Sequence, residues 1–135
     1  MCKNLSDNKM KDNIMKKFLI SLALCLFFYH SVSFAGEADV TEVNVTKNNK
    51  HSYNFNVTVF HKDTGWKHYA DKWEIMGENG TIFGTRILYH PHVDEQPFTR
   101  SLSGVEIPKH VKTVTIRAHD TVHKYGGKVV TIELP

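Results

Sequence analysis

Cysteine is nearly absent from this sequence of 135 residues, and both copies, Cys2 and Cys25, lie in its first quarter. Residues 36–135 therefore contain no thiol that could form a disulfide, act as a nucleophile or bind a metal as a thiolate. A domain built from these residues depends on its hydrophobic core, which a β domain of this size can bury with a modest margin.

Long hydrophobic runs are also missing. The longest apolar stretch, Phe18–Phe28, covers about 11 residues, whereas a membrane-spanning helix requires roughly 20. It follows Lys16-Lys17 and precedes Ser33-Phe34-Ala35, which places small residues at the −3 and −1 positions of a cleavage site. This order is typical of a secretory signal peptide, so we predict that residues 1–35 are a signal peptide removed after Ala35.

The beginning of the chain leaves three alternatives open. Met15-Lys-Lys-Phe-Leu-Ile resembles a natural bacterial start, so residues 1–14 can be a start-site extension. An N-terminal membrane anchor is the second alternative. A lipid anchor on Cys25 is the third, although Leu24 is larger than the residue that normally precedes a lipidated cysteine. The favoured interpretation is a periplasmic or secreted protein without stable membrane insertion after cleavage.

An excess of charge of one sign is absent once the leader is set aside. The first 35 residues hold five of the 17 basic and two of the 14 acidic residues, which leaves 12 of each sign. The formal net charge of +3 therefore comes from the leader. A neutral domain gives no support for binding to nucleic acid or to an anionic membrane surface.

The sequence also lacks the motifs of common enzyme classes. It has no Gly-X-Ser-X-Gly nucleophile motif, no glycine-rich phosphate loop and no HExxH zinc motif. Asp94 and Glu95 are adjacent carboxylates, and Ser101 and Ser103 lie near histidines in the sequence. Nothing in the sequence brings any of them to a common cleft. We therefore predict that the protein is not an enzyme.

Apolar and polar residues alternate from Ala38 onward, with turn residues at short intervals. The clearest alternation covers residues 53–59, where Tyr, Phe and Val point to one face of a strand. Similar short strands are expected at residues 40–45, 69–75, 81–89, 98–102, 114–118 and 130–134. Asn79-Gly80 predicts a hairpin turn, because both residues tolerate a positive φ. A break is expected at residues 105–108, which end in a proline.

Seven such segments without any helical window predict an all-β fold. The expected architecture is an antiparallel immunoglobulin/fibronectin III-like β-sandwich of about seven strands over residues 36–135, preceded by the signal peptide. Trp73 falls in the third segment, where such sandwiches carry a core aromatic residue, whereas Trp66 is expected at a loop end. The paired core cysteines of immunoglobulin domains are absent, which favours the fibronectin-like arrangement.

Histidine is unusually frequent, with eight of the nine copies after residue 35. His90 and His92 flank a proline, and residues two apart in an extended chain point to the same side. His119, Asp120 and His123 surround the last hairpin loop. Imidazole and carboxylate ligands suit zinc, copper(II) or nickel, so these five residues are the candidate metal ligands. The alternative is that the histidines lie on solvent faces and in loops without a metal.

Residues 88–100 contain two prolines, which fix φ and remove backbone donors, so this stretch is expected to be a stiff connection between strands. Arg100 is expected to pair with the acidic Asp94-Glu95 and to brace this connection. The aromatic residues Trp66 and Tyr125 are candidates to stack on a sugar or to anchor a partner protein, unless they cap the end of the core. We treat these five residues as a candidate binding loop.

Four segments resemble a group of small exported bacterial proteins that has no established activity. They are Asp71-Lys-Trp-Glu-Ile, Thr85-Arg-Ile-Leu, His90-Pro-His-Val-Asp-Glu-Gln-Pro-Phe-Thr-Arg and Arg117-Ala-His-Asp120. The resemblance implies an exported β domain and nothing catalytic.

Two functions from different classes fit these observations. The first is an exported, non-catalytic binding module that presents its polar and aromatic loops to a partner protein or a small ligand. The alternative is a periplasmic copper- or zinc-binding protein that uses its loop histidines. Convergence of at least three of the named His and Asp side chains would favour the metal, and an exposed apolar patch would favour the module.

Overall fold

The computed structural model describes residues 36–48 and 51–135. Within these residues the chain is all β, with seven strands and no helix. The described part of the chain therefore offers no helix with the length and apolarity needed to cross a membrane. The predicted signal peptide, residues 1–35, lies outside the described residues and stays a prediction.

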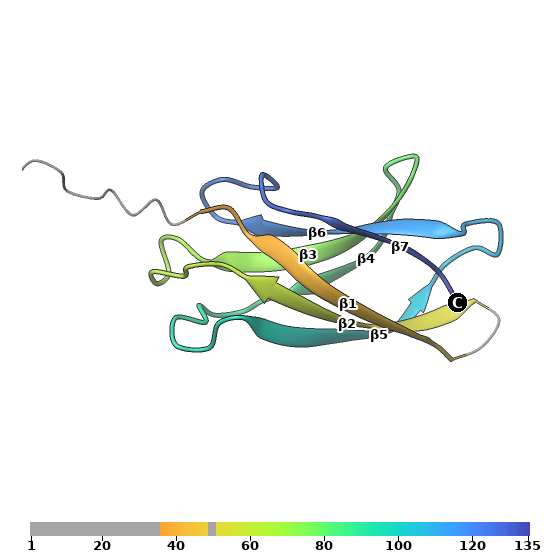
Figure 1. Ribbon diagram of the computed structural model, residues 1–135, viewed down its shortest axis with the longest axis horizontal. Coiled ribbons are helices and arrows are strands. Elements are labelled where there is room, and N and C mark those ends of the chain that lie inside the picture. The colour runs from red at the N-terminus through yellow and green to blue at the C-terminus, as the bar shows by residue number, and fades with distance from the viewer. Residues whose placement is uncertain (1–35, 49–50) are drawn as a thin grey trace, which may run out of the picture. The chain divides into compact units, whose positions relative to one another are not determined.

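The seven strands form two antiparallel sheets that lie face to face (Figure 1). One sheet has the order β1-β2-β5, with β1 at Asp39–Lys47, β2 at Ser52–Phe60 and β5 at Phe98–Glu106. The other has the order β4-β3-β6-β7, with β3 at Ala70–Gly77, β4 at Ile82–Ile87, β6 at Thr113–Asp120 and β7 at Val130–Glu133.

The core lies between the sheets and follows the alternation seen in the sequence. Along β2 every second residue is buried, namely Tyr53, Phe55, Val57 and Val59. Trp73 of β3 is fully buried, whereas Trp66 in the preceding loop is 70% exposed, so the predicted placement of both tryptophans is confirmed. Each large apolar side chain buried in this way contributes about 1.5–3 kcal/mol to stability.

Strand β5 is longer than the sequence predicted, whereas the predicted hairpin at Asn79-Gly80 is present between β3 and β4. The strand expected at residues 98–102 continues to Glu106, because Gly104 adopts a φ of 71° that lets the chain stay paired with β2. At the β3–β4 hairpin only Gly80 has a positive φ, at 84°, and the Gly77 N–H donates to the Thr81 carbonyl at 2.8 Å. One glycine is therefore enough to close this hairpin.

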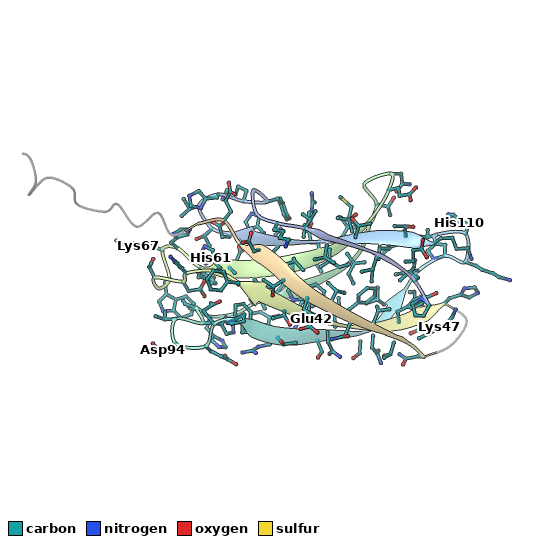
Figure 2. The ribbon with its side chains drawn as sticks, in the orientation of Figure 1. Glu42, Lys47, His61, Lys67, Asp94 and His110 are labelled. Atoms are coloured by element: carbon teal, nitrogen blue, oxygen red, sulfur yellow. The ribbon has the colours of Figure 1, made fainter. Side chains whose placement is uncertain are left out.

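Three loops gather at one end of the sheets: residues 61–69 between β2 and β3, 88–97 between β4 and β5, and 121–129 between β6 and β7. Figure 2 shows His61, Lys67 and Asp94 at this end, with Lys47 and His110 at the opposite end. We call these three loops the histidine end, because they contain five histidines: His61, His68, His90, His92 and His123.

Candidate metal centre

Two polar residues continue the buried faces of strands beyond the apolar core. The alternation of β2 places His61 inward, one residue past the end of the strand, and only 1% of it is exposed. The alternation of β6 places Asp120 inward at its last residue, fully buried. β2 and β6 belong to opposite sheets, and both end at the histidine end. The two side chains therefore lie between the sheets at that end of the core, one from each sheet.

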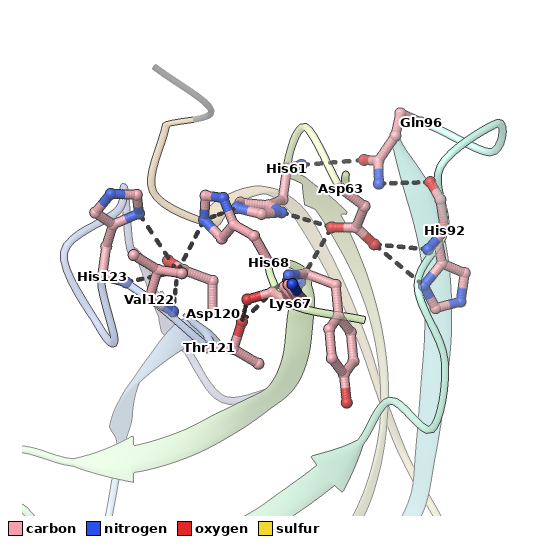
Figure 3. A network of polar contacts seen from close by, with 12 residues as sticks. His61, Asp63, Lys67, His68, His92, Gln96, Asp120, Thr121, Val122 and His123 are labelled. Atoms are coloured by element: carbon pink, nitrogen blue, oxygen red, sulfur yellow. Dashed lines mark hydrogen bonds and ion pairs between the residues drawn. The ribbon is translucent and has the colours of Figure 1, made fainter. Parts of the chain in front are cut away.

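His61, His68 and Asp120 bring their donor atoms together, as Figure 3 shows. The Nε2 atoms of His61 and His68 are 3.3 Å apart. Nε2 of His68 also lies 3.3 Å from Oδ1 of Asp120. One ligand atom from each of the three residues lies within 4.8 Å of the other two. We call these three residues the metal cluster.

Asp63 fixes the orientation of His61. Its Oδ1 accepts from Nδ1 of His61 at 2.5 Å and from the Ala70 amide at 3.0 Å, while Oδ2 accepts from the His92 amide at 2.6 Å. Because Nδ1 carries the proton that this bond needs, Nε2 of His61 presents its lone pair to the metal cluster. Burial alone would raise the pKa of the Asp63 carboxyl, but the hydrogen bonds from His61, His92 and Ala70 hold the pKa below its usual value.

Asp120 is held as an anion by the loop that follows it. Its Oδ1 accepts from the backbone amides of Val122 at 2.9 Å and His123 at 2.6 Å. Burial would raise the pKa of Asp120, but these two amides and the neighbouring histidines lower it. Nδ1 of His123 lies 3.4 Å from Oδ1 of Asp120. The second oxygen of Asp120 is buried and has no hydrogen-bond partner.

The donor set is typical of a transition-metal site. Neutral imidazoles and a carboxylate are the ligands that proteins use for zinc, copper(II) and nickel. A carboxylate bonded to the far nitrogen of a ligating imidazole, as Asp63 is to His61, is the usual support of such a ligand. The metal cluster therefore has the ligand types with which proteins could hold a divalent transition-metal ion.

The candidate ligands named from the sequence fall into three places. Asp120 belongs to the metal cluster and His123 lies beside it. His119 is outside the cluster, because its Nδ1 bonds to Oδ1 of Asp71 at 2.5 Å. His90 and His92 lie in the loop between β4 and β5, and neither is part of the cluster.

His92 is buried, although we expected an exposed loop histidine. It is 4% exposed, its ring stacks on Phe98 with 3.9 Å between the ring centroids, and both ring nitrogens lack a hydrogen-bond partner. Burial is the main reason that the pKa of His92 is lowered, and the charges of Arg100 and His90 lower it further. A neutral, stacked imidazole of this kind acts as part of the core.

Three residues of the site were missed by the sequence analysis: His61, Asp63 and His68. His61 and Asp63 follow β2 at the spacing of its inward-facing residues, which was a usable signal. His68 gave no comparable signal, because it lies in an irregular turn where Gly65 and His68 form an isolated bridge.

The residues of the candidate binding loop have different surroundings. Arg100 forms a bidentate pair with Glu95, at 2.9 and 3.3 Å, so the predicted pairing with the acidic residues is present. Asp94 is exposed at the loop tip, and so is Trp66. Tyr125 instead packs on the outer face of a sheet, with the guanidinium carbon of Arg117 3.9 Å from the centre of its ring.

The chain is similar to a protein of Halomicrobium mukohataei named "Putative lipoprotein", with 36% identity over 97 residues. These residues make up 72% of this chain and 47% of the relative, so the chain spans about half the length of the relative. No protein-family model and no solved structure matches the chain. Its function must therefore be argued from the geometry of the site.

Proposed function

We propose that this protein is an exported, non-catalytic binding protein for a divalent transition-metal ion, held by His61, His68 and Asp120. The observation that supports it most strongly is the convergence of the metal cluster, with its two separations of 3.3 Å between donor atoms. This convergence supports the metal alternative over the general binding module, because the module requires no convergence of ligands.

The polar groups around the cluster are a second support. Oδ2 of Asp120 and Nδ1 of His123 are buried without hydrogen-bond partners. Leaving a buried polar group unpaired costs about 1–3 kcal/mol, so such groups call for a ligand or a bound water. A cation between the cluster residues would neutralise Asp120 and accept the lone pairs of the imidazoles at once.

Calorimetric titration of the protein, prepared without an affinity tag, with zinc(II) and with copper(II) tests the proposal. We expect His68→Ala to weaken binding at least tenfold, which is about 1.4 kcal/mol. The matched control is His110→Ala, which removes an exposed histidine at the opposite end and should leave the affinity unchanged. Equal affinities for the wild type and His68→Ala would refute the metal cluster as the site.

We also propose that the protein is exported, to the periplasm or beyond the cell. The basic, apolar and small-residue segments of residues 16–35 support this, and the name of the relative fits it. Intact-mass measurement of the exported protein distinguishes cleavage before Gly36 from a lipid on Cys25. A product that retains residues 16–30 without lipid would contradict both forms of export.

The strand orders support a finer description of the fold. A three-stranded sheet β1-β2-β5 facing a four-stranded sheet β4-β3-β6-β7, with Trp73 at the centre of β3, is the arrangement we assign to a fibronectin III-like sandwich. In such sandwiches the loops at one end carry binding sites, and the histidine end is such a group of loops.

A partner-binding module is the second candidate, and the exposed aromatic residues favour it. Trp66 is 70% exposed and Tyr89 is 75% exposed, and both lie in loops of the histidine end. Aromatic residues in this position are common anchors for partners. A partner that binds equally well in the presence of a chelator, and is lost in Trp66→Ala, would favour the module over the metal.

A further inference from the structure

We propose that the metal cluster is a tetrahedral zinc site whose fourth ligand is Nδ1 of His123. This inference rests on the proposed metal-binding function and adds the identity of the ion, its geometry and one more ligand. It also excludes an open coordination position, which a catalytic zinc ion would need.

The separations between donor atoms favour a tetrahedral geometry. Zinc bonds of about 2.0–2.1 Å place neighbouring tetrahedral ligands ~3.3–3.4 Å apart. The two His–His and His–Asp separations of the metal cluster are both 3.3 Å, and His123 Nδ1 to Asp120 Oδ1 is 3.4 Å. In a square-planar copper(II) or nickel(II) site with bonds of similar length, neighbouring ligands would lie only about 2.8–2.9 Å apart.

These separations are also too long for strong hydrogen bonds. An N–H donor normally lies about 2.7–3.2 Å from its acceptor. The three contacts exceed this range, whereas the bonds of Asp63 and Asp120 to neighbouring amides are as short as 2.6 Å. These three separations instead match the spacing of neighbouring ligands around a common centre. One donor atom of each of His61, His68 and Asp120 lies within 4.8 Å of the other two, and His123 is not part of this group. Binding by all four residues therefore requires a small closure of the loops.

His123 is already positioned to complete the site. Its Nδ1 is buried without a hydrogen-bond partner, and its ring centroid is 5.0 Å from that of His68. A tight turn holds it there, because the Asp120 and Lys124 amides donate to each other's carbonyls at 3.0 and 3.2 Å. Lys124 adopts a φ of 67° to close this turn, a strained conformation for a residue other than glycine.

The four ligands differ in burial, which indicates how an ion enters. The side chains of His61 and Asp120 are 0% exposed and form the floor, next to strand ends. Those of His68 and His123 are 14% and 30% exposed and form the rim, on loops (Figure 3). An ion can therefore enter and leave past the two rim histidines. A site of this kind suits an exchangeable zinc ion that is carried or buffered.

Cobalt(II) substitution tests the geometry, because tetrahedral cobalt(II) absorbs visible light far more strongly than octahedral cobalt(II). We expect the wild-type protein with cobalt(II) to show the intense tetrahedral spectrum. His123→Ala should shift the absorption bands, since a water oxygen replaces an imidazole nitrogen, and should lower zinc affinity about tenfold or more. The matched control is His119→Ala, a histidine four residues away that bonds to Asp71 and should leave both readouts unchanged.

The outcomes separate this inference from the proposed function. If the wild type binds none of zinc, copper and cobalt, both proposals fail, whereas binding of copper alone overturns only the zinc site. If binding depends on His68 but the cobalt spectrum is of the weak octahedral type, the tetrahedral geometry is overturned. If His123→Ala leaves spectrum and affinity unchanged, His123 as the fourth ligand is overturned. The proposed metal-binding function survives both results. Should His123→Ala fail to fold, the wild-type cobalt spectrum still decides the geometry.

Discussion

The histidine end contains two groups of imidazoles with different surroundings. In the first group, His61 and His68 come from one loop, lie seven residues apart and meet Asp120 from another sheet. In the second, His90 and His92 are two residues apart and their ring centroids are 4.6 Å from each other. Only the first group converges with a carboxylate on a common point. Spacing in the sequence therefore predicts nearness of rings, but not convergence of their nitrogens.

A single carboxylate connects the two groups, but it bonds to a side chain in one and to the backbone in the other. Asp63 accepts from the imidazole of His61 but from the backbone amide of His92, whose own Nδ1 is 4.0 Å away. Gln96 strengthens this connection, because its side chain accepts from the His61 amide and donates to the His92 carbonyl. The Nε2 atom of His61 thus faces that of His68, whereas the ring of His92 packs on Phe98.

The largest expected effect comes from Asp63→Ala, which removes the connection between the groups. The change leaves the amide of His92 and Nδ1 of His61 without their acceptor in a buried site. Losing one partner of a buried charged network costs about 3–5 kcal/mol, so urea unfolding with chelator present should show a loss of this order. The control is Asp94→Ala, at an exposed loop tip, and an equal stability of the two variants would contradict the role of Asp63.

The next largest effect is a loss of stability without a loss of zinc affinity, expected for a change in the second group. His92→Ala removes a ring that is buried against Phe98, and such a truncation in a core costs about 2 kcal/mol or more. Zinc affinity at the metal cluster should stay within about threefold, which is less than 0.7 kcal/mol. Thermal unfolding with chelator and zinc calorimetry measure the two quantities. A stable variant that has lost zinc binding would reverse the roles we assign to the two groups.

A smaller effect is expected on the stability of the protein at low pH. The lowered pKa of His92 means that the unfolded chain takes up its proton more readily than the folded protein as the pH falls below about 6.5. The contribution of His92 to stability is therefore present above this pH and declines below it. In the metal-free protein, stability should fall between pH 7.5 and 5.5, and His92→Phe should reduce this dependence. An unchanged dependence in the variant would assign it to other groups.

The smallest effect is expected at the brace. Arg100 and Glu95 form their pair at the surface, where solvent screens the attraction, so Glu95→Gln should change neither the melting temperature nor zinc affinity measurably. Scanning calorimetry and a zinc titration check this. A clear loss of stability would show that the loop of residues 88–97 depends on the brace more than on Asp63 and Gln96.

Much of the fold could be predicted because it depends on local alternation. The faces of β2 and β6, the burial of Trp73 and the Glu95–Arg100 pair all follow from residues close in sequence or from period-two patterns. The extent of β5 could not be predicted, since it depends on one glycine adopting a positive φ.

The metal cluster was harder to predict because it depends on where strands of different sheets end. His61 and Asp120 are 59 positions apart, and they meet only because β2 and β6 end at the same level of facing sheets. The inward alternation that reaches His61 and Asp120 was visible in the sequence. The turn that brings His68 between them has no periodic pattern from which its direction could be read.

The most direct test of the metal cluster is anomalous diffraction at the zinc edge from crystals of the tag-free protein with zinc. We predict one strong peak among Nε2 of His61, Nε2 of His68 and a carboxylate oxygen of Asp120, at bond lengths of about 2.0–2.2 Å. No peak is expected beside His90 or His92. A peak at those two residues, or none at the metal cluster in crystals with ample zinc, would contradict this prediction.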